Sequence, residues 1–310
     1  MAYYLDNFSP FIIKFGSNFG IRWYGFSYLL AFLCGFLLLR WLAQHRYCAL
    51  PAAKMGDFIF FASLGVIIGG RLGYVLFYRP QQALADPLFI LRVWDGGMSS
   101  HGGMIGLTLA TFWYARQQRI SWLSLADNIA ISAPVGLFFG RCANFINGEL
   151  YGRPSTLPWA VQFPKETRDL PAIGERALAA AHAVQPSVGN LDVVIERARS
   201  DVTLQAVLQQ TLTPRHPSQI YEALLEGALL FACLWFLRLR TRQPRGMLAG
   251  LFLLFYAVVR IIVENFREPD APLTGPFTRG QTLSVMLVVG GICFCVYALK
   301  TKQYEAAQRK

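Results

Sequence analysis

Long apolar stretches, separated by short segments that carry charges and turn residues, dominate the pattern of hydrophobic and polar positions along the chain. A helix needs about 20 apolar residues to cross a bilayer. About seven stretches are predicted to be such spans: residues 20–42, 56–78, 102–114, 125–146, 218–237, 247–266 and 281–299. The third is short unless it begins in the loop before it. The pattern therefore predicts an all-α polytopic membrane protein.

One polar segment is much longer than the others, and it covers residues 150–217. Alanine-rich helical patterns within it, near residues 174–184 and 191–212, predict helices. We expect one transmembrane domain over residues 1–310, in which residues 150–217 form a small cap outside the membrane. The two halves show no internal repeat, which disfavours the inverted-repeat transporter architectures.

Basic residues between the apolar stretches predict the orientation, because cytoplasmic loops are enriched in Lys and Arg. They gather after the first, third, fifth and seventh stretches. We therefore expect the N-terminus and the cap outside and the C-terminus in the cytoplasm. No basic segment precedes the first stretch and no small-residue cleavage site follows it, so it is predicted to be a retained helix.

Composition supports the membrane class and excludes others. The chain is 54% hydrophobic and 15% charged, with a mean hydropathy of +0.37, which is too apolar for an ordinary soluble domain. The net charge of +11 lies in short loops rather than on one face, so no nucleic-acid partner is expected. The six cysteines and four histidines show neither disulfide nor zinc spacing, and we expect no metal.

Charged side chains inside the apolar stretches indicate function, since each costs about 2.5–3.5 kcal/mol at the bilayer centre. The charges in question are Arg71, Asp127, Arg141, Glu222, Glu226, Arg260 and Glu264. One helical face is expected to carry Tyr256, Arg260, Glu264 and Arg267. The structural alternative is an Arg260–Glu264 salt bridge that only neutralises both groups.

Arg141, near the outer end of the fourth apolar stretch, is expected to approach the same leaflet as Arg260. Two guanidiniums at headgroup depth form a phosphate site, because each planar fork donates two hydrogen bonds. A phospholipid headgroup is the anion at hand. The alternative is that each arginine extends separately to the interface.

The segment DGGMSSHGGMIG, residues 95–106, places five glycines and one histidine at the start of a predicted span. Tight packing of helices through small residues is one interpretation. Proton exchange between His101 and a substrate at the outer interface is the other. The sequence leaves both open.

A specific pattern occurs at residues 140–152, GRCANFINGELYG, which resembles the signature of bacterial prolipoprotein diacylglyceryl transferases. Further blocks similar to that family are RWYG at 22–25, GGRLGY at 69–74, SSHGGMIG at 99–106, RHPSQIYEA at 215–223 and RIIVENFREPD at 260–270. The resemblance leaves residues 165–213 mainly unmatched, so it does not indicate how this insert handles a protein substrate.

This resemblance implies an enzyme of the bacterial inner membrane that acts on phosphatidylglycerol and prolipoproteins. It would transfer the diacylglyceryl group to the thiol of the lipobox cysteine, forming a thioether and releasing glycerol phosphate, as the first step of lipoprotein maturation. The family needs no metal and no organic cofactor.

The resemblance also implies roles for particular residues. Arg141 and Arg260 would bind and stabilise the phosphate. Glu264 and Arg267 would complete the cluster, and His101 would help to deprotonate the thiol. The other matching positions, expected to shape the headgroup site or the lipid cavity, are Tyr24, Asn144, Glu149, Gly152 and Tyr256.

Two other classes compete with the enzyme. A transporter or channel would use buried charges to line a solute path. Here the polar residues gather toward one leaflet, which favours a lipid-facing site. A membrane-anchored scaffold would tolerate the loss of Arg141 and Arg260.

Overall fold

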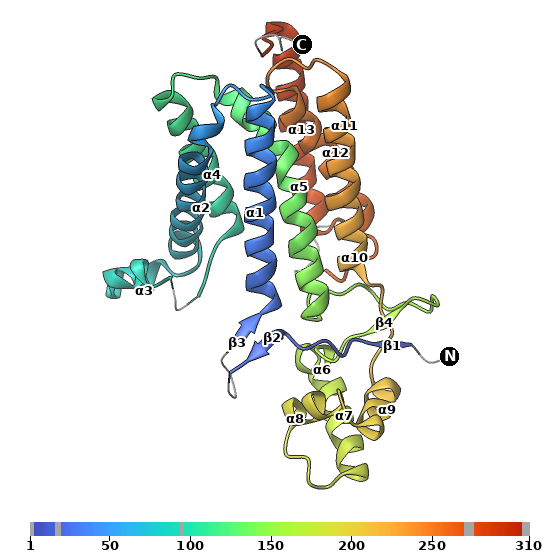
Figure 1. Ribbon diagram of the computed structural model, residues 1–310. Coiled ribbons are helices and arrows are strands. Elements are labelled where there is room, and N and C mark those ends of the chain that lie inside the picture. The colour runs from blue at the N-terminus through green and yellow to red at the C-terminus, as the bar shows by residue number, and fades with distance from the viewer. Residues whose placement is uncertain (1–2, 16–19, 94–95, 270–275, 306–310) are drawn as a thin grey trace. The chain divides into compact units, whose positions relative to one another are not determined.

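The computed structural model of the chain describes residues 3–15, 20–93, 96–269 and 276–305 (Figure 1). Among these residues, five helices are long and apolar enough to cross a membrane: Trp23–Gln44, Ala52–Tyr78, Trp122–Ile146, Ser218–Arg240 and Gly280–Thr301. Met247–Val263 is a shorter apolar helix. The all-α polytopic class is confirmed, and the count of seven spans stays a prediction.

The chain divides into two compact units, which are described separately. The first contains residues 1–33, 133–236 and 251–292, and the second contains residues 34–132, 237–250 and 293–310. Five helices contribute residues to both: α1 (Trp23–Gln44), α5 (Trp122–Ile146), α11 (Leu230–Arg240), α12 (Met247–Val263) and α13 (Arg279–Thr301).

The second unit is built around two closely packed helices, α2 (Met55–Tyr78) and α4 (Ser100–Gln117). Glycines make this approach possible. A Cβ on Gly106 would lie 2.0 Å from the carbonyl oxygen of Gly65, and one on Gly69 would lie 2.4 Å from that of Gly102. The structure therefore shows the small-residue packing that the glycine pattern suggested. The predicted third span, 102–114, is longer at both ends.

Short helical elements complete the second unit around this pair: η1 (Ala52–Lys54), α3 (Pro80–Ala85) and η2 (Pro87–Leu91). Arg71 of α2 is 3% exposed and fastens the loop that leads to α4. Its guanidinium donates to the carbonyl oxygens of Phe89 and Gly96 at 2.5 Å and of Ile90 and Gly97 at 3.2 Å. These contacts give Arg71 a structural role, the fixing of this loop.

Asp127 of α5, like Arg71, is bound to backbone groups of the second unit. Its carboxylate accepts hydrogen bonds from the N–H groups of Gly246 and Ala249, both at 2.8 Å. The first N–H groups of a helix lack partners within the helix, so an acidic side chain there caps it. Asp127 therefore fixes the start of α12.

The first unit contains parts of several helices and two small sheets. Strand β1 (Tyr4–Leu5) pairs in parallel with β4 (Val161–Gln162), and β2 (Phe11–Lys14) pairs antiparallel with β3 (Gly20–Arg22). The helix α10 (Ser218–Glu222) continues through a π-helical segment, η4 (Ala223–Leu229), into α11.

The predicted cap contains four short helices, which Figure 1 shows near β1 and β4: α6 (Glu166–Asp169), α7 (Pro171–Val184), α8 (Leu191–Arg197) and α9 (Val202–Thr211). The prediction of one helix near residues 191–212 was wrong. Asp201 starts a new helix by accepting hydrogen bonds from the N–H groups of Thr203 and Leu204.

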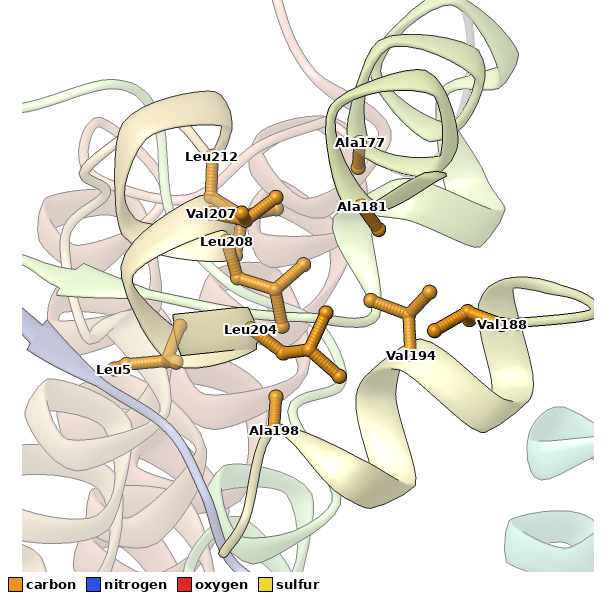
Figure 2. Close-up of a cluster of buried hydrophobic side chains, with 10 residues drawn as sticks. All are labelled: Leu5, Ala177, Ala181, Val188, Val194, Ala198, Leu204, Val207, Leu208 and Leu212. Carbon is orange, nitrogen blue, oxygen red and sulfur yellow. The ribbon is translucent and has the colours of Figure 1, made fainter. Parts of the chain in front are cut away.

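The cap has a hydrophobic core of its own (Figure 2). Ala177 and Ala181 of α7 face Val194 of α8, and α9 contributes Leu204 and Leu208. Leu5 from β1 enters the same cluster and is 2% exposed. The N-terminal strand is thereby packed onto the cap, and the alanines allow α7 to approach closely.

Candidate functional site

A cluster of six charged side chains lies in the first unit, and three separate stretches of the chain supply it. Its members are Arg141 of α5, Glu222 of α10, Glu226 of η4, Arg260 of α12, and Glu264 and Arg267 directly after α12. Three are arginines and three are glutamates. We call this group the Arg–Glu cluster.

Glu222 is the centre of the Arg–Glu cluster, since its carboxylate meets all three arginines. Its Oε2 lies 2.8 Å from Nε of Arg141. Its Oε1 lies 3.0 Å from Nη1 of Arg260 and 3.0 Å from Nη1 of Arg267. The side chain of Glu222 is completely buried. A buried carboxylate at this position is satisfied only while the three arginines surround it.

Glu226 provides a second bridge between α5 and α12. Its Oε2 lies 3.4 Å from Nη2 of Arg141, and its Oε1 lies 3.2 Å from Nη1 of Arg260. Arg141 and Arg260 are therefore tied together by two carboxylates. The geometry differs from separate arginines that extend independently to the interface.

The π-helical segment accounts for the joint position of the two carboxylates. Glu222 directly precedes this segment and Glu226 lies within it. A π-helix has a wider turn than an α-helix, and such segments occur frequently at functional sites. Gly227 accommodates the packing, because a Cβ there would lie 2.7 Å from Cβ of Phe138.

The end of α12 places the remaining two members. The helix ends at Val263, so the prediction of a helix to residue 266 was wrong. Residues 264–266 form a turn, and Arg267 reaches the cluster from the isolated β-bridge that follows it. Arg260 nevertheless contacts Glu264 at 3.0 Å through the predicted spacing of four residues. This contact belongs to the larger cluster and does not stand alone. Asp270, the last residue of that sequence block, lies outside the described residues.

Exposure differs between the acidic and the basic members of the cluster. The side chains of Glu222 and Glu226 are 0% exposed, whereas those of Arg141 and Arg260 are 15% and 13% exposed. An approaching anion would therefore meet guanidiniums, with the carboxylates hidden behind them. Each guanidinium has five N–H donors, more than its carboxylate contacts use. The arrangement suits the binding of a phosphate.

A second buried charge group holds the loops beside the cluster. Arg215 is 5% exposed and contacts Glu166 at 2.7 Å and Glu268 at 3.0 Å. It also donates to the carbonyl oxygen of Gly152 at 3.1 Å. Gly152 forms an antiparallel bridge with Arg267. Arg215 thus joins the cap, the end of the 140–152 signature and the segment that carries Arg267.

Gly152 has a steric role in this junction. A Cβ there would lie 2.5 Å from the carbonyl oxygen of Phe266 and 2.6 Å from the backbone oxygen of His216. We expect Gly152→Ala to lower the free energy of unfolding by about 1–3 kcal/mol, because backbone atoms cannot move away cheaply. Thermal unfolding in detergent checks this. Gly136→Ala is the matched control, since no atom lies within 4 Å of its Cβ position; equal midpoints for both variants would contradict the prediction.

The other predicted site residues of the first unit lie near the cluster or its loops. Asn144 is 7% exposed, one helical turn after Arg141. Glu149 contacts Lys165 of the cap at 2.9 Å. Tyr24 contacts Tyr28, with 3.3 Å between their hydroxyl oxygens.

Two predicted residues remain. Tyr256 lies one turn before Arg260 on α12, with its ring stacked on that of Phe252. His101 lies in the second unit as the second residue of α4, with an exposed side chain. Asp95, at the start of its sequence block, lies outside the described residues. The roles of all these residues stay predictions.

Sequence reasoning recognised Glu222 and Glu226 as intramembrane charges but gave them no place in the site. Both are the bridging groups between Arg141 and Arg260. Their spacing of four residues on one apolar helix was the available signal. Arg215 was noted only as part of a sequence block, and nothing in its neighbourhood indicated that its guanidinium would be buried.

Comparison with known proteins agrees with the family resemblance of the sequence blocks. The family model described as prolipoprotein diacylglyceryl transferase matches residues 10–297. A phosphatidylglycerol-prolipoprotein diacylglyceryl transferase of Bdellovibrio bacteriovorus is 40% identical, covering 94% of this chain and 93% of the relative. Proteins of the same name from Zymomonas mobilis and Burkholderia thailandensis are also 40% identical, covering 90% and 95% of this chain and 84% and 96% of their own lengths.

Proposed function

Because the chain belongs to the prolipoprotein diacylglyceryl transferase family, we propose that its Arg–Glu cluster binds the phosphate of phosphatidylglycerol. The enzyme transfers the diacylglyceryl group of this lipid to the thiol of a prolipoprotein's lipobox cysteine. The observation that carries the proposal is the pairing of partly exposed guanidiniums with fully buried carboxylates. This arrangement holds the donors in fixed positions before the lipid arrives.

The reaction makes one bond and breaks one. The cysteine thiolate attacks the glycerol carbon that bears the phosphate ester, so a C–S bond forms as the C–O bond to phosphate breaks. The electron pair of that bond leaves with glycerol phosphate. Arg141 and Arg260 stabilise the charge that develops on the phosphate, because preorganised donors act most strongly where charge grows in the transition state.

The carboxylates of the cluster position the arginines. A guanidinium without a fixed partner has several rotatable bonds and would have to be ordered by the substrate. Glu222 contacts all three arginines, and Glu226 contacts two of them. The lipid therefore meets donors that are already in place, which lowers the cost of reaching the transition state.

The orientation of the chain is part of the proposal. Basic residues gather at the segments after α1, α4, α11 and α13. This pattern favours a cytoplasmic position for these segments and for the C-terminus. The N-terminus and the cap then lie outside the inner membrane. The Arg–Glu cluster, at the α12 end that leads to the outer loops, faces the outer leaflet.

The proposal is tested by incubating the purified full-length protein with phosphatidylglycerol vesicles and a peptide that contains a lipobox cysteine. Mass spectrometry of the peptide should show a diacylglyceryl gain on the cysteine, and phosphate analysis should show an equal amount of glycerol phosphate. A peptide with serine in place of the cysteine is the control. Absence of the mass gain with folded protein would refute the transferase activity.

His101 is proposed to accept the proton of the attacking thiol. We expect His101→Asn to lower turnover at neutral pH about a hundredfold, because general bases contribute effects of this size. The loss should shrink as the pH approaches about 8.5, where the thiol ionises without help. Turnover from pH 6 to 9 measures this, with the exposed His45→Asn as control. A small loss with an unchanged pH profile would indicate a packing role.

A further inference from the structure

A cavity of about 110 Å³ in the first unit has no part in the chemistry described above. It lies where the N-terminal segment, the end of α5 and the cap meet. Its walls include Asp6, Asn147, Lys165, Arg168 and Arg199. Two of these offer acceptor oxygens and three offer positive charge.

The acceptor oxygens lack good donors in the described part of the chain. Asp6 is 6% exposed, and its carboxylate accepts a long hydrogen bond, 3.4 Å, from the N–H of Phe8. Oδ1 of Asn147 is buried without a hydrogen-bond partner. Buried acceptors of this kind are unusual in proteins and are satisfied by water or by a ligand with donors. Hydroxyl groups are suitable donors.

The basic side chains are available to an anion although each already meets a carboxylate. The pairs are Lys165 with Glu149 at 2.9 Å, Arg168 with Asp192 at 2.6 Å and Arg199 with Glu196 at 2.5 Å. The three acidic partners are 36%, 71% and 55% exposed. Such exposed pairs are weak and exchange easily. An anion that enters the cavity can therefore take their place.

The position of the cavity relates it to the Arg–Glu cluster. Asn147 follows Arg141 by six residues, and α5 covers all but the last of them, which corresponds to about 9 Å along the helix axis. The cavity is also small, since one of about 150 Å³ is needed to hold a molecule the size of benzene completely. It fits a small polar molecule that remains partly in solvent, and it cannot hold an acyl chain.

We propose that this cavity is a product site, which receives the glycerol phosphate released at the Arg–Glu cluster. The hydroxyl groups would donate to Asp6 and Asn147, and the phosphate would accept from Lys165, Arg168 and Arg199. A small anion of this kind cannot leave through lipid, so a polar binding site beside the cap gives it a route to water. This inference rests on the proposed transfer reaction.

Protonation of Asp6 affects the charge that the ligand meets. Burial raises the pKa of this carboxyl to about 7, while the Phe8 N–H and the charge of Arg199 oppose the rise. The other charged groups lining the cavity are Lys165 and Arg168, and the phenol of Tyr4 lies close enough to interact. Below pH 7 the neutral carboxyl does not repel phosphate, and above it the carboxylate does. At pH 8 the unchanged protein should therefore bind phosphate less tightly than a variant in which residue 6 carries no charge.

The test uses the full-length enzyme in detergent and measures glycerol phosphate in two ways. Calorimetric titration gives its affinity directly, and product inhibition of peptide modification gives its inhibition constant. We expect Arg168→Ala with Arg199→Ala to weaken both about tenfold at pH 6.5, without changing turnover in the absence of product. Asp6→Asn should bind glycerol phosphate about as tightly as the unchanged protein at pH 6 and more tightly at pH 8. The comparison is made at equal pH because the phosphate itself loses its second proton at about pH 6. The exposed cap variant Arg176→Ala is the control.

Several results would overturn the product site. Unchanged glycerol phosphate affinity in the double variant, together with lost affinity in Arg141→Ala, would place the ligand at the Arg–Glu cluster instead. Equal affinity for inorganic phosphate and glycerol phosphate would refute recognition of the hydroxyl groups. Transfer activity without any product binding would refute the site while leaving the proposed function intact, whereas absent transfer activity would refute the function itself.

Discussion

Arg260→Ala and Arg141→Ala are each expected to lower turnover by about a hundredfold to a thousandfold or more, while the protein still inserts into the membrane. Loss of one preorganised donor to a developing anion costs this much in other enzymes. Each guanidinium is only partly exposed, and buried carboxylates hold it, two for Arg141 and three for Arg260. Water therefore cannot replace it in the same geometry. The effect should appear in turnover more than in lipid binding, because the charge grows in the transition state.

The measurement is the mass-spectrometric transfer assay at several phosphatidylglycerol concentrations. Arg141→Lys and Arg260→Lys separate charge from geometry, since lysine keeps the charge but cannot donate from a planar fork. We expect the lysine variants to stay severely impaired. Arg176→Ala, at an exposed position of the cap, is the matched control. Near-normal turnover in either alanine variant would remove that arginine from the catalytic site.

Glu222→Ala is expected to lower both stability and activity, because this carboxylate contacts all three arginines of the cluster. Breaking a buried ion pair by removing one partner costs about 3–5 kcal/mol. For a protein of this size that corresponds to a fall of about 10 °C in the midpoint of thermal unfolding. Turnover should fall with it, since Arg141 and Arg260 lose a common anchor.

Thermal unfolding in detergent and the transfer assay measure the two effects together. Glu222→Gln keeps the shape and an acceptor oxygen but not the charge, so it should be more stable than Glu222→Ala and still poorly active. Glu175→Gln, exposed on the cap helix α7, is the control. An active and stable Glu222→Ala protein would show that the arginines hold their positions without this carboxylate.

The pattern of apolar and polar residues predicted much of the fold. Stretches of about 20 apolar residues have few stable alternatives to a helix in a membrane, because backbone groups must be satisfied within the segment. The glycines of the 95–106 segment likewise suggested close helix packing, and two of them meet Gly65 and Gly69 of α2. The exact ends of helices were harder to predict. Asp201 divides one predicted helix into two, and α12 ends before Glu264.

The partners of the intramembrane charges depended on tertiary packing. Arg71 and Asp127 were as conspicuous in the sequence as Arg141, yet their partners are backbone groups of the 89–97 loop and of the start of α12. Backbone carbonyl and N–H groups are the same at every residue, so no sequence pattern marks the ones that will be partners. Only the folded chain separates these structural charges from the Arg–Glu cluster.

By itself, the sequence determined the membrane class, the positions of the apolar helices and the family signature, because hydrophobic length and residue identity are local properties. It also marked Arg141 and Arg260 as charges that need an explanation. Only the tertiary structure decided that Glu222 and Glu226 join them and that Arg267 enters from the β-bridge with Gly152. Those contacts connect residues far apart in the chain, and the packing of α5, α12 and the π-helical segment determines which side chains meet.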